Sequence, residues 1–311
     1  MNHSTPFHAG EIAVQDRAGV PQRAREMATR AIRDAMPAQH QAFFETLPLM
    51  FIALLDRRGR PWAVPVSGAP GYARALSPRQ LSLSRLPALA EEFELDTDPG
   101  AGIGLLGIDL ATRRRNRLNG QIASGVDGLV IAVEQSFGNC PKYIQTRIYE
   151  SSRNDPPSPV RRQAQLKSEA VREIIAGADT FFIASRGANP AGSANEGLDV
   201  SHRGGRPGFL GNNENGTLSF PDYSGNRYFN TLGNIEADGR VGLFVPDFTT
   251  GAAALVTGRA TIDWMSDRIG AFAGAERFVD ITCDEVWHVA GALPSTALPV
   301  EFSSPLDRTE A

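Results

Sequence analysis

The sequence predicts a mainly β fold with flanking helices, of the α+β class, in which tandem split β-barrels pack as a pseudo-dimer. The chain of 311 residues holds 31 glycines and 21 prolines, about 17% of all residues where ~12% is usual, which favours tight turns between short strands. Turn residues separate strand-like runs such as VGLFVPDF and AALVTGRATIDW. Two long segments also match each other, which indicates a repeated structural unit.

The repeat is most specific where residues 102–121 align without a gap on residues 240–259, at a constant spacing of 138 residues. Five pairs are identical at that spacing: Gly104/Gly242, Leu105/Leu243, Asp109/Asp247, Thr112/Thr250 and Gly120/Gly258. The tripeptides Phe-Ile-Ala (51–53 and 182–184) and Gly-Arg-Pro (59–61 and 205–207) also recur. Chance explains this combination poorly, so we expect similar strand-turn-strand units in both halves.

Helical spacing of apolar residues predicts helices over residues 21–36 and 160–176. Each precedes a strand-like run, FFETLPLMFIALLD or ADTFFIASRG. The three prolines of SSRNDPPSPV disfavour both helix and strand, which predicts a linker. The expected order is an N-terminal tail and helix (1–36), a first half (37–150), the linker (151–159), a second half (160–293) and a C-terminal tail (294–311).

Composition excludes several function classes. The 31 basic and 35 acidic residues give a net charge of −4 without a long block of one sign, which argues against a dedicated nucleic-acid binder. The longest apolar stretch, residues 49–55, is too short to span a membrane, and the N-terminus lacks the apolar core of a secretory signal. We therefore expect a cytoplasmic protein. Cys140 and Cys283 have no zinc-site spacing and are expected to be small structural residues.

A candidate anion site lies in PDYSGNRYFNTLGNI, residues 221–235. Its turn is expected to end a strand and to open a helix at about Arg227, and a helix N-terminus attracts anions. Thr231 and Asn234 would share one polar stripe of that helix with Arg227. This arrangement suits a phosphate held by Arg227 with hydroxyl and amide help.

A plainer interpretation of the same residues is equally open. Asp222 and Ser224 are ordinary turn and cap residues, and Arg227 is then a solvated surface charge. The polar strand end at Ser201 and Arg203, before two glycines, is likewise common in hairpin turns. Arg203 would be the second cation if the anion site is real.

The sequence resembles the pyridoxamine 5'-phosphate oxidase-like FMN-binding split-barrel family, in particular its large two-barrel bacterial branch. The segments that carry the resemblance are DVSHRGGRPGFL, FPDYSGNRYFNTLGNI, VGLFVPDF and LVTGRA in the second half and FGNCPKYIQ in the first. Together they are specific, and the resemblance covers most of residues 40–290. His202 stands where the resemblance leads us to expect proline, and it is expected to be a surface residue.

The resemblance implies an FMN at the junction of two barrels, with its phosphate held by the strand-end arginine and the turn-helix segment. The cofactor contacts that it implies are Ser201, Arg203, Phe220, Pro221, Asp222, Asn226, Arg227 and Asn234, with Lys142 of the first half as part of the partner wall. The first half has LSLSRLPALAEEFELD in place of the turn, so its own site is expected to be degenerate. One intact site per chain follows.

The function that this implies is an FMN-dependent oxidoreductase acting on an unidentified small molecule. Electrons would come from a nicotinamide donor or a redox partner protein, and a homodimer is compatible with this scheme. FMN is preferred to FAD because no GxGxxG pattern of the chain is expected to follow a strand and open a helix, as a dinucleotide fingerprint does. A non-catalytic flavin-binding or electron-relay module and a haem-binding relative are the alternatives.

No motif marks a catalytic residue or a metal site, since flavin itself carries the redox chemistry. The basic run TRRRNR (112–117) is expected to be a solvated strand face. The secondary interpretation is that the run lies in a groove and accepts an anionic substrate or a reduced dinucleotide.

Overall fold

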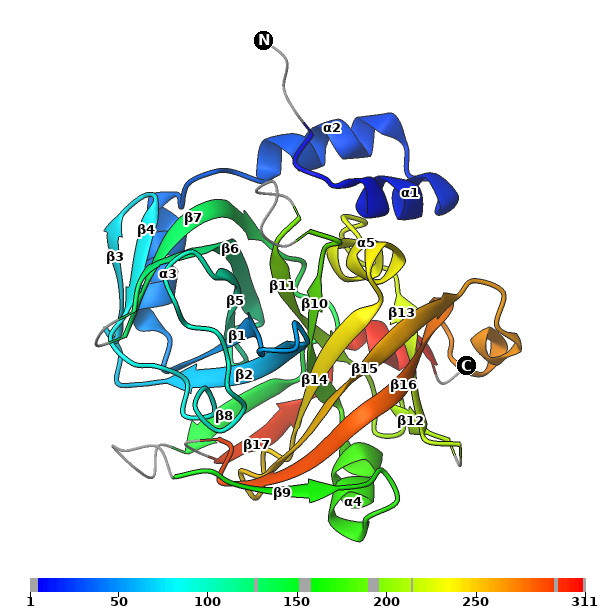
Figure 1. Ribbon diagram of the computed structural model, residues 1–311. Helices are drawn as coiled ribbons and strands as arrows, with labels where there is room; N and C mark the ends of the chain where they lie inside the picture. Colours follow the sequence, from blue (N-terminus) through cyan, green and yellow to red (C-terminus); the bar gives the residue numbers. More distant parts are fainter. Residues whose placement is uncertain are drawn as a thin grey trace.

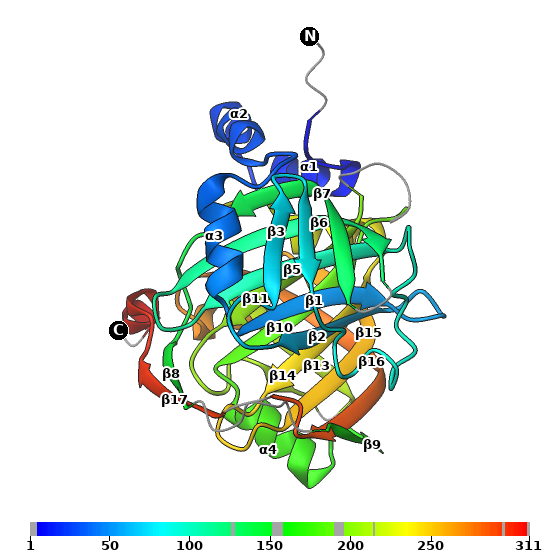
Figure 2. The same ribbon diagram turned by 90° about the vertical axis from the view of Figure 1, so that its left-hand side faces the viewer.

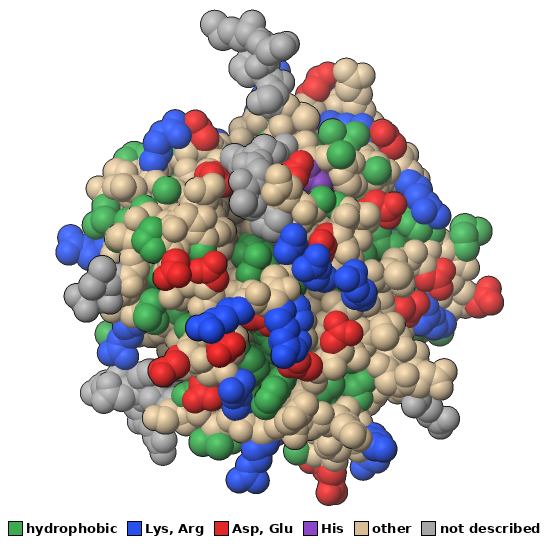
Figure 3. Space-filling model, in the orientation of Figure 1, with side chains coloured by type: hydrophobic (Ala, Val, Ile, Leu, Met, Phe, Trp, Pro, Cys, Tyr) green, Lys and Arg blue, Asp and Glu red, His purple; other side chains and the backbone are tan. Residues whose placement is uncertain are grey.

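Two large antiparallel sheets dominate the computed structural model of the chain, which describes residues 5–125, 128–150, 158–189, 196–213, 215–293 and 296–309 (Figure 1). The predicted class, mainly β with few helices, is confirmed. Helices α1 and α2 lie at one end of the molecule and α4 at the opposite end (Figure 2). Basic and acidic side chains are interspersed over the face that Figure 3 presents. Among the described helices, none combines the length and apolar character that crossing a membrane requires.

The first sheet has the order β2-β1-β5-β6-β7-β4-β3. Its strands are β1 (Leu49–Leu55), β2 (Pro61–Ser67), β3 (Ala73–Ser77), β4 (Gln80–Leu83), β5 (Gly102–Asp109), β6 (Arg114–Ser124) and β7 (Leu129–Gly138). The second sheet has the order β11-β10-β14-β15-β16-β13-β12. Its strands are β10 (Thr180–Arg186), β11 (Leu198–Gly204), β12 (Gly211–Asn212), β13 (Thr217–Tyr223), β14 (Arg240–Pro246), β15 (Ala253–Asp263) and β16 (Ala275–Ala290).

The remaining elements flank these sheets. Strand β9 (Val160–Ala164) pairs with β16, and β8 (Thr146–Glu150) pairs with β17 (Thr296–Glu301). The α-helices are α1 (Ala9–Arg17), α2 (Gln22–Ala31), α3 (Ala38–Thr46), α4 (Glu169–Gly177) and α5 (Asn230–Ala237), and two 3-10 turns, η1 and η2, cover Asp267–Ala271 and Ser304–Thr309.

Both sheets follow the same strand order, with β1 equivalent to β10 and β5 to β14. The register is also the same, because Ile52 faces Leu105 in one sheet and Ile183 faces Leu243 in the other. Residues that match at a spacing of 138 along the chain therefore occupy equivalent places in the two sheets.

The identical glycines of the match have a steric reason. Each sheet has a bulge at the same place, before Gly120 in β6 and before Gly258 in β15. A Cβ atom at Gly120 would collide with the carbonyl oxygen of Ala132, and one at Gly258 with that of Thr282. Only glycine fits both positions.

The two halves pack against each other reciprocally. Phe51 of β1 stacks on its equivalent Phe182 of β10, with ring centroids 3.4 Å apart and an interplanar angle of 13°. Gly104 of β5 lies against the backbone of β11, while Gly242 of β14 lies against the backbone of β2. One hydrophobic core contains buried residues from both sheets, so the halves form a single packed body around a local pseudo-twofold axis.

Several expected elements are wrong in detail. The helix expected over 160–176 is strand β9 followed by α4 from Glu169, because residues 160–164 pair with the long strand β16. The helix over 21–36 ends at Ala31, and the strand-like run at 43–56 begins inside α3. Pairing with β16 overrides the local apolar spacing of residues 160–164.

Three further expectations about the chain order need correction or lie outside the described residues. The tail expected from residue 294 contains β17, which pairs with β8 of the first half. The Gly-Arg-Pro tripeptides are not equivalent, since one lies before β2 and the other follows β11. The expected linker falls mostly in residues 151–157, outside the described ranges.

Candidate functional site

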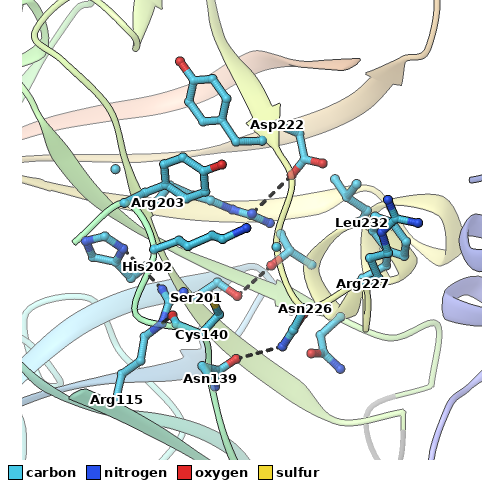
Figure 4. A pocket seen from close by; sticks show the side chains of 18 of the residues that line it. Arg115, Asn139, Cys140, Ser201, His202, Arg203, Asp222, Asn226, Arg227 and Leu232 are labelled. Carbon is cyan, nitrogen blue, oxygen red and sulfur yellow. Dashed lines mark hydrogen bonds and ion pairs between the residues drawn. The ribbon is translucent and has the colours of Figure 1, made fainter. Parts of the chain in front are cut away.

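A hollow opens at the junction of the two halves (Figure 4). The first half contributes β6 and the segment after β7, and the second half contributes β11, β13, the turn after β13 and the start of α5. Among the described residues, its lining includes the cations Arg115, Arg117, Lys142, Arg203 and Arg227 but a single carboxylate, Asp222. This excess of positive charge suits an anionic ligand.

Most of the sequence-predicted contacts meet in this hollow. Its lining contains Ser201, Arg203, Pro221, Asp222, Asn226, Arg227 and Lys142. Phe220 and Asn234 are not part of the lining, which corrects their expected direct contact with a ligand. Phe220 is fully buried against Phe181, and Asn234 donates to Ser185 Oγ at 3.0 Å beneath α5. Both side chains support the walls instead.

The helix expected at Arg227 begins three residues later, at Asn230. Arg227 and Phe229 both have a φ of 62°, in the left-handed region, so the chain turns sharply before the helix can start. Arg227 is consequently an exposed cation at the edge of the hollow rather than part of a helical stripe. Thr231 points inward and donates to Ser201 Oγ at 2.8 Å.

Strand β6 carries two cations that the sequence analysis underrated. Successive side chains of a strand point to opposite faces, so Arg115 and Arg117 share one face while Arg114 takes the other. Arg115 and Arg117 line the hollow, whereas Arg114 is exposed over the ring of Phe43. The basic run is therefore not a uniformly solvated face. The alternation of side chains along a strand was the sequence signal that could have separated Arg115 and Arg117 from Arg114.

Arg117 is the most tightly held cation of the hollow. It forms an ion pair with Asp199 at 2.9 Å, and both side chains are buried. It also donates to Ser201 Oγ at 2.6 Å and to Asn230 Oδ1 at 2.9 Å. Because burying a charge is costly unless it is paired, Asp199 compensates Arg117 and fixes the base of the hollow.

Arg203 and Asp222 form the second compensated pair, at 3.2 Å (Figure 4). The Nε atom of Arg277 lies 3.7 Å from Oδ2 of the same carboxylate. Burial raises the pKa of Asp222, while the two guanidinium groups oppose that rise. Asp222 therefore acts as the shared ion-pair partner of Arg203 and Arg277.

Arg115 differs from these two arginines. Its Nε donates to the carbonyl oxygen of Cys140 at 2.9 Å, and its Nη1 lies 3.3 Å from Nδ1 of His202. Across the described ranges, no carboxylate is ion-paired with it. Burial, with the charges of Arg117 and Arg203, lowers the pKa of Arg115 to about 9.

His202 and Cys140 are closer to the site than expected. His202 is only 4% exposed and is not a surface residue. Burial and the neighbouring charges of Arg115, Arg147 and Arg203 lower its pKa well below 6.5, so the imidazole is neutral. Cys140, expected to be merely structural, lines the hollow beside Arg115.

The segment after β7 closes the hollow from the first half. Tyr143 stacks on Tyr223 with ring centroids 5.0 Å apart and an interplanar angle of 20°. Asn226 donates to Asn139 Oδ1 at 3.3 Å, so both halves are tied together at the rim. Lys142 lies on this segment and remains exposed.

The equivalent place on the other side of the pseudo-twofold axis is apolar. The positions that match Arg115, Arg117 and Ser201 by register are Ala253, Leu255 and Val64. All three are fully buried in the common core. The cationic hollow is thus not repeated by these equivalent positions.

No cluster of three or more metal-binding side chains occurs in the part of the chain that the structure describes. The hollow offers charged and hydrogen-bonding side chains for a ligand.

Comparisons with known proteins give distant likenesses. No family model and no curated protein matches the chain. Among solved structures, the H111A variant of HupZ from Group A Streptococcus has 12% identity and a TM-score of 0.31, covering 39% of this chain and 98% of that one. A protein from Lactobacillus delbrueckii, named as a candidate pyridoxamine 5'-phosphate oxidase, has 15% identity and a TM-score of 0.30, covering 38% of this chain and 91% of that one. A protein from Mesorhizobium loti, named as FAD-binding, has 12% identity and a TM-score of 0.27, covering 42% of this chain and 97% of that one.

Proposed function

We propose that the hollow between the two halves binds FMN and that the protein is a flavoprotein. The observation that carries this proposal is the excess of cationic side chains around one opening, built from both halves. A phosphate monoester is dianionic near neutral pH, and arginine donors bind it in two-pronged geometry. Arg115 supplies a guanidinium that has no carboxylate partner among the residues that the structure describes, and a phosphate would complete it.

The residues that carry the sequence resemblance support the same assignment. Ser201, Arg203, Asp222, Asn226 and Arg227 lie around one hollow although they come from different elements. FMN fits better than FAD because the cations form one cluster. The GxGxxG pattern of residues 102–107 lies within strand β5 and does not open a helix, as a dinucleotide fingerprint does. In this assignment the arginines hold the phosphate, and the wall of Tyr143 and Tyr223 limits the access of water.

The proposed activity is an FMN-dependent oxidoreduction of a small molecule. Bound flavin would supply the hydride and electron transfer, so the chain need only bind and orient its ligands. The exposed Lys142 and Arg227 at the edge of the hollow suit an anionic electron donor such as a nicotinamide dinucleotide. An electron relay without its own substrate would use the same site with a redox partner protein.

Chromatography of the flavin released by denaturing the purified protein tests the cofactor. We expect FMN, either retained on purification or taken up on reconstitution. A colourless protein that takes up no FMN would refute the proposal. Oxidation of NADH or NADPH by the reconstituted protein separates the oxidoreductase from the electron relay, and a Soret band after haem addition would instead favour a haem protein.

A further inference from the structure

The three arginines from the strands of the hollow differ in how their charge is compensated. Arg117 is paired with Asp199, and Arg203 with Asp222. Within the described ranges, the partners of the Arg115 side chain are neutral: the carbonyl oxygen of Cys140 and the imidazole of His202. Among these three side chains, Arg115 therefore offers the least compensated charge to a ligand.

His202 is well placed to orient Arg115 without neutralising it. Its neutral ring accepts through Nδ1 from Arg115 Nη1, which leaves the ring hydrogen on Nε2. The ring is fixed on β11 by burial and by edge contact with Phe182, at 5.7 Å between ring centroids. A carboxylate in the same place would satisfy the same donor but would also cancel the charge.

We infer that His202 is a positioning residue that directs the Arg115 guanidinium into the hollow. Because His202 is neutral, the charge of Arg115 remains uncompensated, and Arg115 becomes the main contact for a dianionic phosphate monoester. This inference rests on the proposed function where it names the phosphate of FMN as the ligand. The two nearest guanidinium groups, Arg117 and Arg203, raise the local potential but are already engaged by acids. Arg227 lies exposed at the edge, where solvent screens its charge.

His202→Asn and His202→Asp form a matched pair that tests this role. The two side chains have nearly the same shape, and each places Oδ1 close to the position of Nδ1. They differ in charge and in the second polar atom, which is a donor in Asn and an acceptor in Asp. We expect His202→Asn to keep FMN affinity within about threefold of the original protein, because a neutral acceptor remains. His202→Asp should weaken FMN by roughly 10- to 100-fold and leave riboflavin affinity unchanged, since riboflavin lacks the phosphate.

A residue that only fills space would be replaced by leucine without loss, so an unchanged FMN affinity in His202→Leu would overturn the inference while leaving FMN binding intact. Equal FMN affinity in His202→Asn and His202→Asp would overturn it as well. Melting temperatures of both variants show whether they fold. If His202→Asp does not fold, Arg115→Met decides the matter, because the inference requires a loss of the preference for FMN over riboflavin, and an unchanged preference overturns it.

Inorganic phosphate separates this inference from the proposed function. If neither flavin binds the original protein, phosphate is titrated and followed by the chemical shift of the arginine Nε–H groups. Phosphate binding that His202→Asp loses and His202→Asn keeps would support the role of His202 while FMN is rejected. Absence of phosphate binding, or equal binding by both variants, would overturn the inference.

Discussion

Arg114 and Arg115 are neighbours in sequence with opposite surroundings. Arg115 faces the hollow and has no carboxylate partner in the part of the chain that the structure describes, whereas Arg114 lies exposed over Phe43. We predict that Arg115→Met lowers FMN affinity by about 10- to 100-fold, since a charge-assisted hydrogen bond contributes roughly 1.5–3 kcal/mol. Arg114→Met removes the same charge from the same strand and should change the affinity by less than about threefold. Fluorescence quenching of FMN measures both, and equal losses would contradict the assignment.

Arg227 provides a second comparison at the residue scale. It was expected to be the principal phosphate contact, yet it precedes α5 and is exposed. We predict that Arg227→Ala weakens FMN by no more than about tenfold, less than Arg115→Met, because solvent screens an exposed charge. Titration in low and high salt checks this, since the contribution of Arg227 should shrink as salt increases. A loss larger than that of Arg115→Met would return the phosphate to Arg227.

Sequence could identify the neighbourhood of the site better than the direction of each side chain. Pro221 and Asp222 reach the hollow, but Phe220 on the same strand points into the core. The resemblance implied all three as cofactor contacts, because a match between sequences identifies consecutive residues but not the face of the strand to which each side chain points. His202 had no motif to mark it, since its role depends on Arg115, a residue 87 positions away.

At the scale of elements, the crossing of α1 over α5 is unusually close. A Cβ atom at Gly233 of α5 would lie 2.6 Å from the backbone nitrogen of Glu11 in α1. We predict that Gly233→Ala lowers the free energy of unfolding by about 1–3 kcal/mol, because overpacking outweighs the better helix propensity of alanine. Gly177→Ala in α4, where the added methyl meets open space, is the matched control and should not destabilise. Urea unfolding measures both, and a neutral Gly233→Ala would show that the helices separate easily.

The same crossing buries an ionisable group, Glu11. Burial raises its pKa to about 8, although hydrogen bonds from the His8 backbone and Asn230 and the charge of Arg117 act in the opposite direction. Between the ordinary value of 4.5 and about 8, the folded state holds a proton that the unfolded state has lost, so this group makes stability fall as pH rises.

Glu11→Gln removes that titration. We predict that the stability of Glu11→Gln relative to the original protein increases from pH 5 to pH 8 and is constant above about pH 9. Urea unfolding of both proteins across this range gives the difference. A difference that is independent of pH would mean that Glu11 titrates normally.

The element boundaries that sequence misplaced share a cause. Residues 160–164 have apolar spacing that suits a helix, but strand β16 offers them an edge to pair with. Helix α1 was not predicted, and its residues were assigned to an N-terminal tail. Its docking depends on Gly233 and Asn230, which lie far along the chain. Local propensity carries no information about such long-range partners.

At the scale of the whole molecule, one strand order occurs twice, but the cationic hollow does not recur at the equivalent positions. The gapless match at a spacing of 138 pointed to equivalent strands, and the register of β5 and β14 places the matched residues accordingly. The missing Gly-Asn-Arg turn pointed to one degenerate half. Sequence alternation could separate Arg115 and Arg117 from Arg114, but it could not show that these first-half side chains reach the hollow of the second half, because that depends on how the two halves pack.

The stoichiometry of FMN binding tests this account most directly. Purified protein is titrated with FMN at a protein concentration well above the dissociation constant, and bound flavin is counted per chain by absorbance after gel filtration. The account predicts one FMN per chain, because Ala253, Leu255 and Val64 fill the equivalent place on the other side of the axis. No bound FMN, or two per chain with similar affinity, would contradict it.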